Sequence, residues 1–165
     1  MLNQNNDPLA RAVHALLLAQ KQTLALAESC TGGLITHRLT NLPGSSAYLI
    51  AAVIAYAYEA KVAALGVSWD TLHEYGAVSP QVAREMARGA RERFSSSLGV
   101  AVTGIAGPGG STPEKPVGLT YIALASPGDV IIERYVWQGD REQNKTQSAD
   151  AVLQLLQRYL TKSNS

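Results

Sequence analysis

Three short apolar runs, each ending in small or polar residues, constrain the fold of this chain more than any other feature. They are residues 23–28, 47–56 and 100–103. Their lengths suit strands, and the second run is almost continuously apolar, which is typical of a strand covered on both faces. Two later apolar runs, residues 117–125 and 130–137, flank a Ser-Pro-Gly turn and predict a hairpin.

Segments with helical signals lie between these runs. Asp7 before Pro8, and Ser79 before Pro80, each place a capping residue ahead of a proline at the first helical position. Helices are predicted from residue 8, over 34–42, 59–65 and 80–94, and from 140 to about 160. Strands that alternate with helices and end in a hairpin predict a three-layer α/β/α sandwich. Its sheet is expected to be mostly parallel, with an antiparallel edge hairpin.

Size and charge narrow the class of protein. The 165 residues fit one domain, so we expect residues 1–165 to form a single unit. A net charge of +1, with basic and acidic residues mixed along the chain, leaves no electrostatic footprint for nucleic acid or an anionic membrane. The single cysteine, Cys30, excludes an internal disulfide and favours a reducing compartment.

Targeting signals point the same way. The first eight residues lack the basic region of a signal peptide. The longest uncharged apolar run, residues 47–58, is shorter than the roughly 20 residues that span a bilayer. We therefore expect a cytoplasmic protein that binds neither membrane nor nucleic acid.

Three loops that follow predicted strands have unusual sequences. They contain Ser29 to Gly33, Tyr56 with Lys61 shortly after it, and residues 103–107. If the strands are parallel neighbours, these loops converge on one crevice, where ligands of open α/β sheets bind. Backbone N–H groups and a helix starting near Gly32 would suit a phosphate or a developing oxyanion. The alternative is that the glycines only make tight turns, but three such loops together favour a functional site.

Several known sites are excluded. The glycine loops match neither a P-loop nor the G-x-G-x-x-G fingerprint, and Ser29 lacks the glycines of a G-x-S-x-G elbow. His14 and His37 fall within predicted helices, and His73 lies in a polar stretch, so none is an obvious base. No cluster of His, Cys, Asp and Glu has metal-ligand spacing, and no metal is expected.

Lysine remains as a base. Lys61 is the only lysine or arginine between Arg38 and Arg84 and has apolar neighbours. Desolvation lowers the pKa of an amine, and a lysine at about 7–8 could deprotonate Ser29, as in Ser-Lys hydrolases. Tyr56 could relay the proton or donate to the oxyanion. An ordinary helix lysine paired with Glu59 is the alternative.

Cys30 is a rival nucleophile. A lone cysteine after a strand is more often a small buried apolar residue. Ser29 is therefore the preferred nucleophile.

Several blocks of sequence together resemble the CinA C-terminal domain family. The blocks are residues 27–33, 43–47, 59–61, 65–67, 76–79, 102–108, 114–118 and 139–141, and the likeness extends over about residues 8–160. The resemblance implies a three-layer α/β domain, often a homodimer, that acts as a nicotinamide-nucleotide amidase without a cofactor. Such an enzyme hydrolyses nicotinamide mononucleotide to nicotinate mononucleotide and ammonia.

The resemblance also assigns roles to residues. Ser29, Tyr56 and Lys61 fall on the catalytic positions. The nucleotide would be held by Thr31, Gly32, Gly33, Ser45, Ser46, Thr103, Gly104, Ala106 and Arg141.

The chain departs from the family pattern at three positions: Tyr58 replaces a small amide side chain, Gly109 replaces an aspartate, and Lys145 stands where an arginine is expected. These departures leave open a second hypothesis, a catalytically altered module of the same fold that binds pyridine nucleotides or a partner. A phosphoryl-transfer enzyme is disfavoured, because no carboxylate cluster is placed to hold magnesium.

Overall fold

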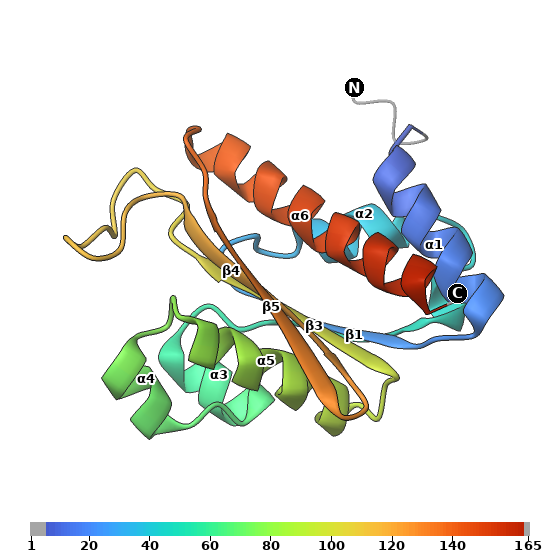
Figure 1. The fold of residues 1–165 in the computed structure, drawn as a ribbon, viewed down its shortest axis with the longest axis horizontal. Helices are drawn as coiled ribbons and strands as arrows, with labels where there is room; N and C mark the ends of the chain where they lie inside the picture. Colours follow the sequence, from blue (N-terminus) through green and yellow to red (C-terminus); the bar gives the residue numbers. More distant parts are fainter. Residues whose placement is uncertain (1–5, 164–165) are drawn as a thin grey trace.

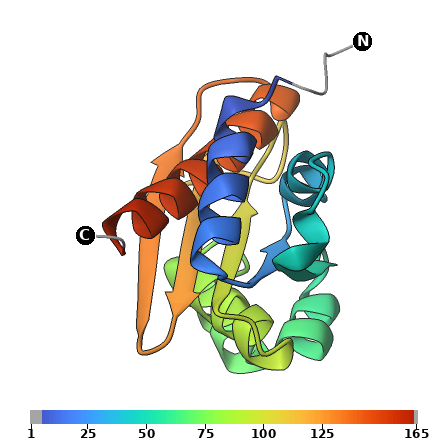
Figure 2. The ribbon, with the colours of Figure 1, turned by 90° about the vertical axis from the view of Figure 1, so that its right-hand side faces the viewer.

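A five-stranded mixed sheet forms the middle layer of the protein. The computed structural model describes residues 6–163. Its strands are β1 (Leu24–Glu28), β2 (Leu49–Ile54), β3 (Leu98–Gly104), β4 (Leu119–Ser126) and β5 (Asp129–Val136), in the spatial order β2-β1-β3-β4-β5. β2, β1 and β3 are parallel, whereas β4 and β5 are antiparallel to their neighbours. The predicted three-layer class, with an antiparallel hairpin at one edge, is confirmed (Figure 2).

Helices cover both faces of the sheet (Figure 1). α1 (Pro8–Gln20), α2 (Leu34–Thr40) and α6 (Arg141–Lys162) lie on one face. α3 (Tyr58–Leu65), α4 (Trp69–Tyr75) and α5 (Pro80–Arg93) lie on the other. A short 3₁₀ helix, Ser45–Ala47, leads into β2. Among the described residues, no helix is both long and apolar enough to cross a bilayer.

Alternation along the strands separates two apolar cores. Leu98, Val100 and Val102 of β3 face α1 and α6, whereas Ala101 faces α5. The α5 side of the sheet is built from small residues, and at Gly99 an added Cβ would lie 2.2 Å from the backbone oxygen of Ala87 in α5. α5 can therefore lie close against the sheet, because β3 presents almost no side chain there.

Capping residues start the helices where the sequence predicts. The Asp7 side chain accepts from the amide of Ala10, and the Ser79 hydroxyl accepts from the amide of Val82. Asp140 caps α6 through a reciprocal capping box with Gln143.

One expectation was wrong, and one helix was not predicted. β2 is an edge strand and is not covered on both faces: its residues alternate in exposure, and Ile50 and Ile54 are 49% and 54% exposed. The apolar run is continuous, but the strand order places β2 outside β1, where only one of its faces meets a helix layer. Residues 69–75, which include His73, form the unexpected helix α4, capped by Ser68.

Candidate functional site

The carboxyl ends of three parallel strands bring the expected loops together. Glu28, the last residue of β1, is opposite Ile54 of β2 and Val102 of β3. Ser29 therefore leaves the sheet between the ends of its two neighbours. Ligands bind at this kind of edge in open α/β sheets.

Lys61 contacts Ser29 at these carboxyl ends of the strands. Its Nζ lies 3.1 Å from Ser29 Oγ, 2.7 Å from the carbonyl oxygen of Ala55 and 3.2 Å from that of Tyr56. Lys61 lies in the first turn of α3 and is only 1% exposed, and within residues 6–163 it forms no ion pair with a carboxylate. The interpretation of Lys61 as a surface lysine paired with Glu59 is therefore wrong.

Burial tunes the amine of Lys61. Desolvation disfavours the charged form and lowers the pKa of Lys61 to about 8. A neutral amine has two N–H bonds and one lone pair. When the carbonyl oxygens of Ala55 and Tyr56 take the two hydrogens, the lone pair is left facing Ser29. The geometry suits proton transfer from the hydroxyl to the amine.

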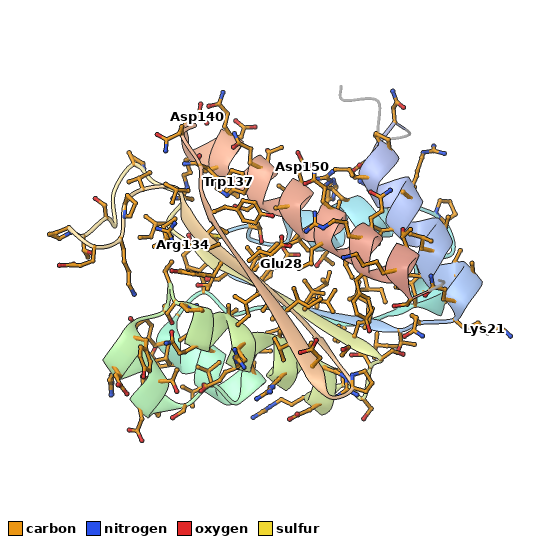
Figure 3. All side chains as sticks on the ribbon, in the orientation of Figure 1. Lys21, Glu28, Arg134, Trp137, Asp140 and Asp150 are labelled. Carbon is orange, nitrogen blue, oxygen red and sulfur yellow. The ribbon has the colours of Figure 1, made fainter. Side chains whose placement is uncertain are left out.

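Glu28 holds the turn that carries Ser29. Its Oε2 accepts from Thr31 Oγ1 (2.6 Å) and from the amides of Gly33 (3.0 Å) and Ile35 (3.2 Å). Its Oε1 accepts from the amide (2.8 Å) and hydroxyl (2.7 Å) of Thr36. Figure 3 shows Glu28 inside the molecule, between the sheet and the helices. Sequence reasoning missed this role, although an acidic residue before a turn with two threonines nearby is a usable signal.

The start of α2 is thus occupied by the protein's own carboxyl group. The amide of Gly33 donates to Glu28, and the amide of Gly32 donates to the carbonyl oxygen of Ser29. The Thr31 hydroxyl is also bound to Glu28. The expected anion site at this helix start is filled, so Gly32 and Gly33 shape the turn with their positive φ angles of 61° and 99°.

Cys30 is buried in the core, and desolvation raises the pKa of its thiol to about 12. The thiolate is the nucleophilic form of cysteine. This burial favours Ser29 over Cys30.

Tyr56 contributes two different atoms. Its backbone carbonyl accepts from Lys61, while its hydroxyl accepts from Arg141 Nη2 at 3.0 Å. Arg141 Nη1 donates to the carbonyl oxygen of Gly107 at 2.7 Å. One turn further along α6, Lys145 lies over the Ser29 turn, because a Cβ added at Gly32 would be 3.9 Å from Lys145 Nζ. Two cations of α6 therefore border the loops that hold Ser29 and Tyr56.

The third loop packs directly against the first. A Cβ at Gly104 would lie 3.1 Å from Cys30 Sγ and 2.7 Å from Thr120 Oγ1, so only glycine fits without displacing a neighbour. Thr103 is buried and donates its hydroxyl to the carbonyl oxygen of Ala77. The carbonyl oxygen of Ala106 accepts from Asn144 Nδ2 at 3.0 Å, which ties this loop to α6.

The structure does not bring Ser45 and Ser46 to this edge. The carbonyl oxygen of Tyr48 accepts from the amide of Leu24, so the 3₁₀ helix Ser45–Ala47 lies at the amino ends of β1 and β2. Ser29 lies at the carboxyl end of β1. Within one copy of the chain, these two serines therefore lie at the opposite end of the parallel strands from Ser29.

The surroundings differ at positions 58 and 109, two of the departures from the family pattern. The Tyr58 hydroxyl accepts from the amide of Ala77 at 3.3 Å and so links the start of α3 to the segment before α5. A Cβ at Gly109 would meet nothing within 4 Å, so this position is open. Within residues 6–163, no group of three or more His, Cys, Asp or Glu side chains is arranged to hold a metal ion.

Comparisons with known proteins identify close relatives. The family model of the CinA C-terminal domain matches residues 6–160. A "Putative competence-damage inducible protein" of Moorella thermoacetica is 49% identical over 156 residues, which are 94% of this chain and 38% of that protein. A "CinA-like protein" of Citrifermentans bemidjiense is 51% identical over 147 residues, 88% of this chain and 36% of that protein. The chain thus spans less than two fifths of these curated relatives.

Solved structures share the whole fold. The competence/damage inducible protein CihA from Agrobacterium tumefaciens has a TM-score of 0.89 and 39% identity, covering 93% of both chains. A CinA superfamily protein from Klebsiella pneumoniae has a TM-score of 0.90 and 29% identity, covering 93% of this chain and 96% of that one.

Proposed function

The chain belongs to the CinA C-terminal domain family, and from this premise we propose that it is an amidohydrolase with a Ser29–Lys61 pair at its centre. The observation that carries the proposal is the 3.1 Å approach of Lys61 Nζ to Ser29 Oγ in a buried setting. The proposed substrate is nicotinamide mononucleotide, and the products are nicotinate mononucleotide and ammonia. The resemblance supports the substrate and the amidase reaction, and the geometry supports nucleophilic catalysis by Ser29 with Lys61 as base.

The first half-reaction forms an ester. Neutral Lys61 takes the proton of Ser29 while Ser29 Oγ attacks the carboxamide carbon. The tetrahedral intermediate carries negative charge on oxygen. The amides of Cys30 and Thr31 are proposed to stabilise it, because no carbonyl or carboxylate oxygen in the described part of the chain accepts from them. Protonated Lys61 then gives its proton to the leaving nitrogen, and ammonia departs.

The second half-reaction regenerates Ser29. Neutral Lys61 accepts a proton from water, which attacks the ester carbon, and then returns that proton to Ser29 Oγ as the carboxylic acid leaves and releases its remaining proton to solvent. The same amine acts as base and acid in both halves. A lysine with a pKa of about 8 can do this near neutral pH, since both of its forms are populated.

Arg141 and Lys145 are proposed to face the phosphate of the nucleotide. They are one turn apart at the start of α6, beside the loops that carry Tyr56 and Gly32. Arg141 is already fixed by Tyr56 and Gly107, which orients the guanidinium before substrate arrives. Tyr56 then links Arg141 to Lys61, because its hydroxyl accepts from Arg141 and its backbone carbonyl oxygen accepts from Lys61.

The test is product formation by the purified chain. With nicotinamide mononucleotide and a chelator present, wild type is expected to release ammonia and nicotinate mononucleotide in equal amounts. Ser29→Ala and Lys61→Ala should each lose at least about a thousandfold in kcat. Lys162→Ala, at the exposed end of α6, is the control and should keep full activity.

A binding module of the same fold is the competing function, favoured by the departures at Tyr58 and Lys145. Nucleotide binding by calorimetry with no ammonia from wild type would support the module and contradict the amidase. Equal turnover by Ser29→Ala and wild type would remove Ser29 as nucleophile.

A further inference from the structure

Tyr58 is the first residue of α3, and its side chain is held at the hydroxyl end. The hydroxyl accepts from the amide of Ala77 at 3.3 Å. Tyr58 and Lys61 are three positions apart, so their side chains leave the same side of α3. The Lys61 amine lies 3.1 Å from Ser29 Oγ. The Tyr58 side chain therefore leaves α3 about one turn before the residue that contacts the nucleophile.

The hydroxyl of Tyr58 ends beside a second part of the same crevice. Ala77, whose amide donates to Tyr58, accepts from the Thr103 hydroxyl at 2.8 Å through its carbonyl oxygen. Thr103 follows Val102 in β3, and the carbonyl oxygen of Val102 accepts from the amide of Ser29 at 3.1 Å. These contacts place the ring between α3 and the end of β3, along one side of the crevice. Tyr58 is 37% exposed, which leaves ring surface for a ligand.

The proposed substrate carries two charges of opposite sign. Its phosphate is negative, and its pyridine ring contains a quaternary nitrogen with a positive charge. Arg141 and Lys145 suit the phosphate but repel the ring. The carboxylate of Glu28 is 1% exposed and already accepts five hydrogen bonds from the turn around it, so it cannot contact a ligand. The face of an aromatic ring is the other group that attracts a cation of this kind.

Tyr56 is a second tyrosine near the crevice, and it is less suited to this contact. Its hydroxyl accepts from Arg141 Nη2 at 3.0 Å, so a guanidinium already lies at the rim of its ring. The hydroxyl of Tyr58 accepts instead from a neutral backbone amide. The face of Tyr58 is therefore the more favourable of the two for a further positive charge.

We propose that the face of the Tyr58 ring binds the positively charged pyridine ring of the substrate and so selects cationic pyridine nucleotides over neutral ones of the same shape. The carboxamide of the bound ring then points to Ser29, and the phosphate points to Arg141. The assignment rests on the proposed substrate. It goes beyond the resemblance, because the family pattern has a small amide side chain where this chain has Tyr58.

Binding separates this contact from catalysis. Ser29→Ala lacks the nucleophile, so calorimetry measures its affinity for nicotinamide mononucleotide without turnover. The matched ligand is benzamide riboside 5′-monophosphate, in which carbon replaces the charged ring nitrogen. In the Ser29→Ala background, Tyr58→Leu is expected to weaken binding of nicotinamide mononucleotide about 3- to 30-fold, the range of a cation–π contact. The neutral ligand should lose less than twofold, because leucine still offers it an apolar contact.

Three variants control the result, each checked for folding by thermal unfolding. Tyr58→Phe keeps the ring and loses only the hydroxyl that accepts from Ala77, so it should keep the preference for the charged ligand. Tyr58→Asn, a second variant without the ring, restores a small amide side chain and should behave as Tyr58→Leu. Tyr75→Leu removes another tyrosine, 40% exposed on α4, and should change neither affinity.

Equal weakening of both ligands by Tyr58→Leu and Tyr58→Asn, or no weakening of either, overturns the proposal. A Ser29→Ala protein that does not bind nicotinamide mononucleotide overturns it as well. The amidase proposal fails on a different observation, namely that wild type releases no ammonia while the charged ligand still binds through Tyr58. Conversely, turnover by wild type with equal weakening of both ligands leaves the amidase intact and removes the role of Tyr58.

Discussion

Replacing Glu28 with glutamine should separate the folding role of this residue from the chemistry next to it. The two side chains have the same shape, but glutamine offers one carbonyl oxygen where Glu28 offers two. Glu28 accepts three hydrogen bonds at Oε2 and two at Oε1. In the better orientation, the glutamine oxygen keeps the Oε2 partners and its NH₂ group faces Thr36.

The cost follows from what Thr36 then lacks. The Thr36 hydroxyl can rotate to accept a hydrogen bond from the new NH₂ group. The Thr36 backbone N–H, in contrast, would face that NH₂ group, and two donors cannot form a hydrogen bond. A buried donor without a partner costs about 1–3 kcal/mol, and exchanging a charged for a neutral acceptor weakens the other bonds. We expect Glu28→Gln to lower the free energy of unfolding by about 2–4 kcal/mol. Because the turn that positions Ser29 loosens, kcat should also fall about tenfold to a hundredfold.

Denaturant unfolding gives the first quantity and ammonia release the second. Glu92→Gln, the same substitution at an exposed position of α5, is the matched control and should change neither by a measurable amount. Thr36→Val removes one of the hydrogen bonds to Glu28 but leaves the Thr36 amide in place, and should cost about 1 kcal/mol. Surface substitutions change the free energy of unfolding by up to about 0.5 kcal/mol. If the free energy of unfolding of Glu28→Gln differs from that of wild type by no more than this, the turn does not depend on the Glu28 carboxyl group and the reasoning is refuted.

Three further predictions rest on other contacts. The value of kcat/KM should rise with pH and level off above about 8, as Lys61 loses its proton. Since the folded pKa of Lys61 lies below its ordinary value of 10.5, the unfolded chain binds more protons between the two values. The free energy of unfolding should therefore gain from Lys61 as pH rises through that window, and this gain should be absent in Lys61→Met. Gly104→Ala places a Cβ 2.7 Å from a threonine hydroxyl of β4 and should cost about 1–3 kcal/mol by thermal unfolding, whereas Gly109→Ala, with open space around it, should be neutral. Arg38→Met removes an ion pair with Asp7 at 2.6 Å and should cost about 1–3 kcal/mol at pH 7. Because the Arg38 guanidinium lowers the pKa of Asp7, wild-type Asp7 stays ionised below its ordinary pKa of 3.8, and this cost should shrink only as pH falls through the lowered value.

The convergence of the loops that carry Ser29 and Lys61 was predictable from local sequence, because both residues follow apolar runs within a few positions and parallel neighbouring strands end on the same side of the sheet. The residues alone left Lys61 open as an ordinary helix lysine, and the resemblance to the CinA C-terminal domain family favoured it as the base. The 3.1 Å distance and the burial of Lys61 agree with that inference. The two carbonyl partners of Lys61 were not predictable, because they depend on how the chain bends after β2.

The features that the sequence did not predict depend on contacts between segments that are distant in the chain. The run 47–56 shows that β2 is apolar, but only strand order decides that no helix layer covers its outer side. Likewise, a glutamate at a strand end gains its significance from Gly33, Ile35 and Thr36, whose amides turn toward it only once α2 has formed. Ser45 and Ser46 were grouped with the site because a resemblance supplies roles without supplying positions in space.

The strand order explains why the Ser29–Lys61 pair lies at the end of β1 and not at another strand end. From β1 the chain crosses through α2 on one face to reach β2, and from β2 it crosses through α3, α4 and α5 on the opposite face to reach β3. The two connections run over opposite faces of the sheet and in opposite directions from β1. No crossover helix therefore covers the carboxyl end of β1. Ser29 occupies that opening, and the helix on one side holds its turn through Glu28 while the helix on the other supplies Lys61. If β1 and β2 exchanged places, the same order of elements along the chain would put Ser29 at the sheet edge. Gly104 and Cys30 could not then pack against each other, so the position of β1 between β2 and β3 is what permits one serine to be contacted from both neighbouring strands.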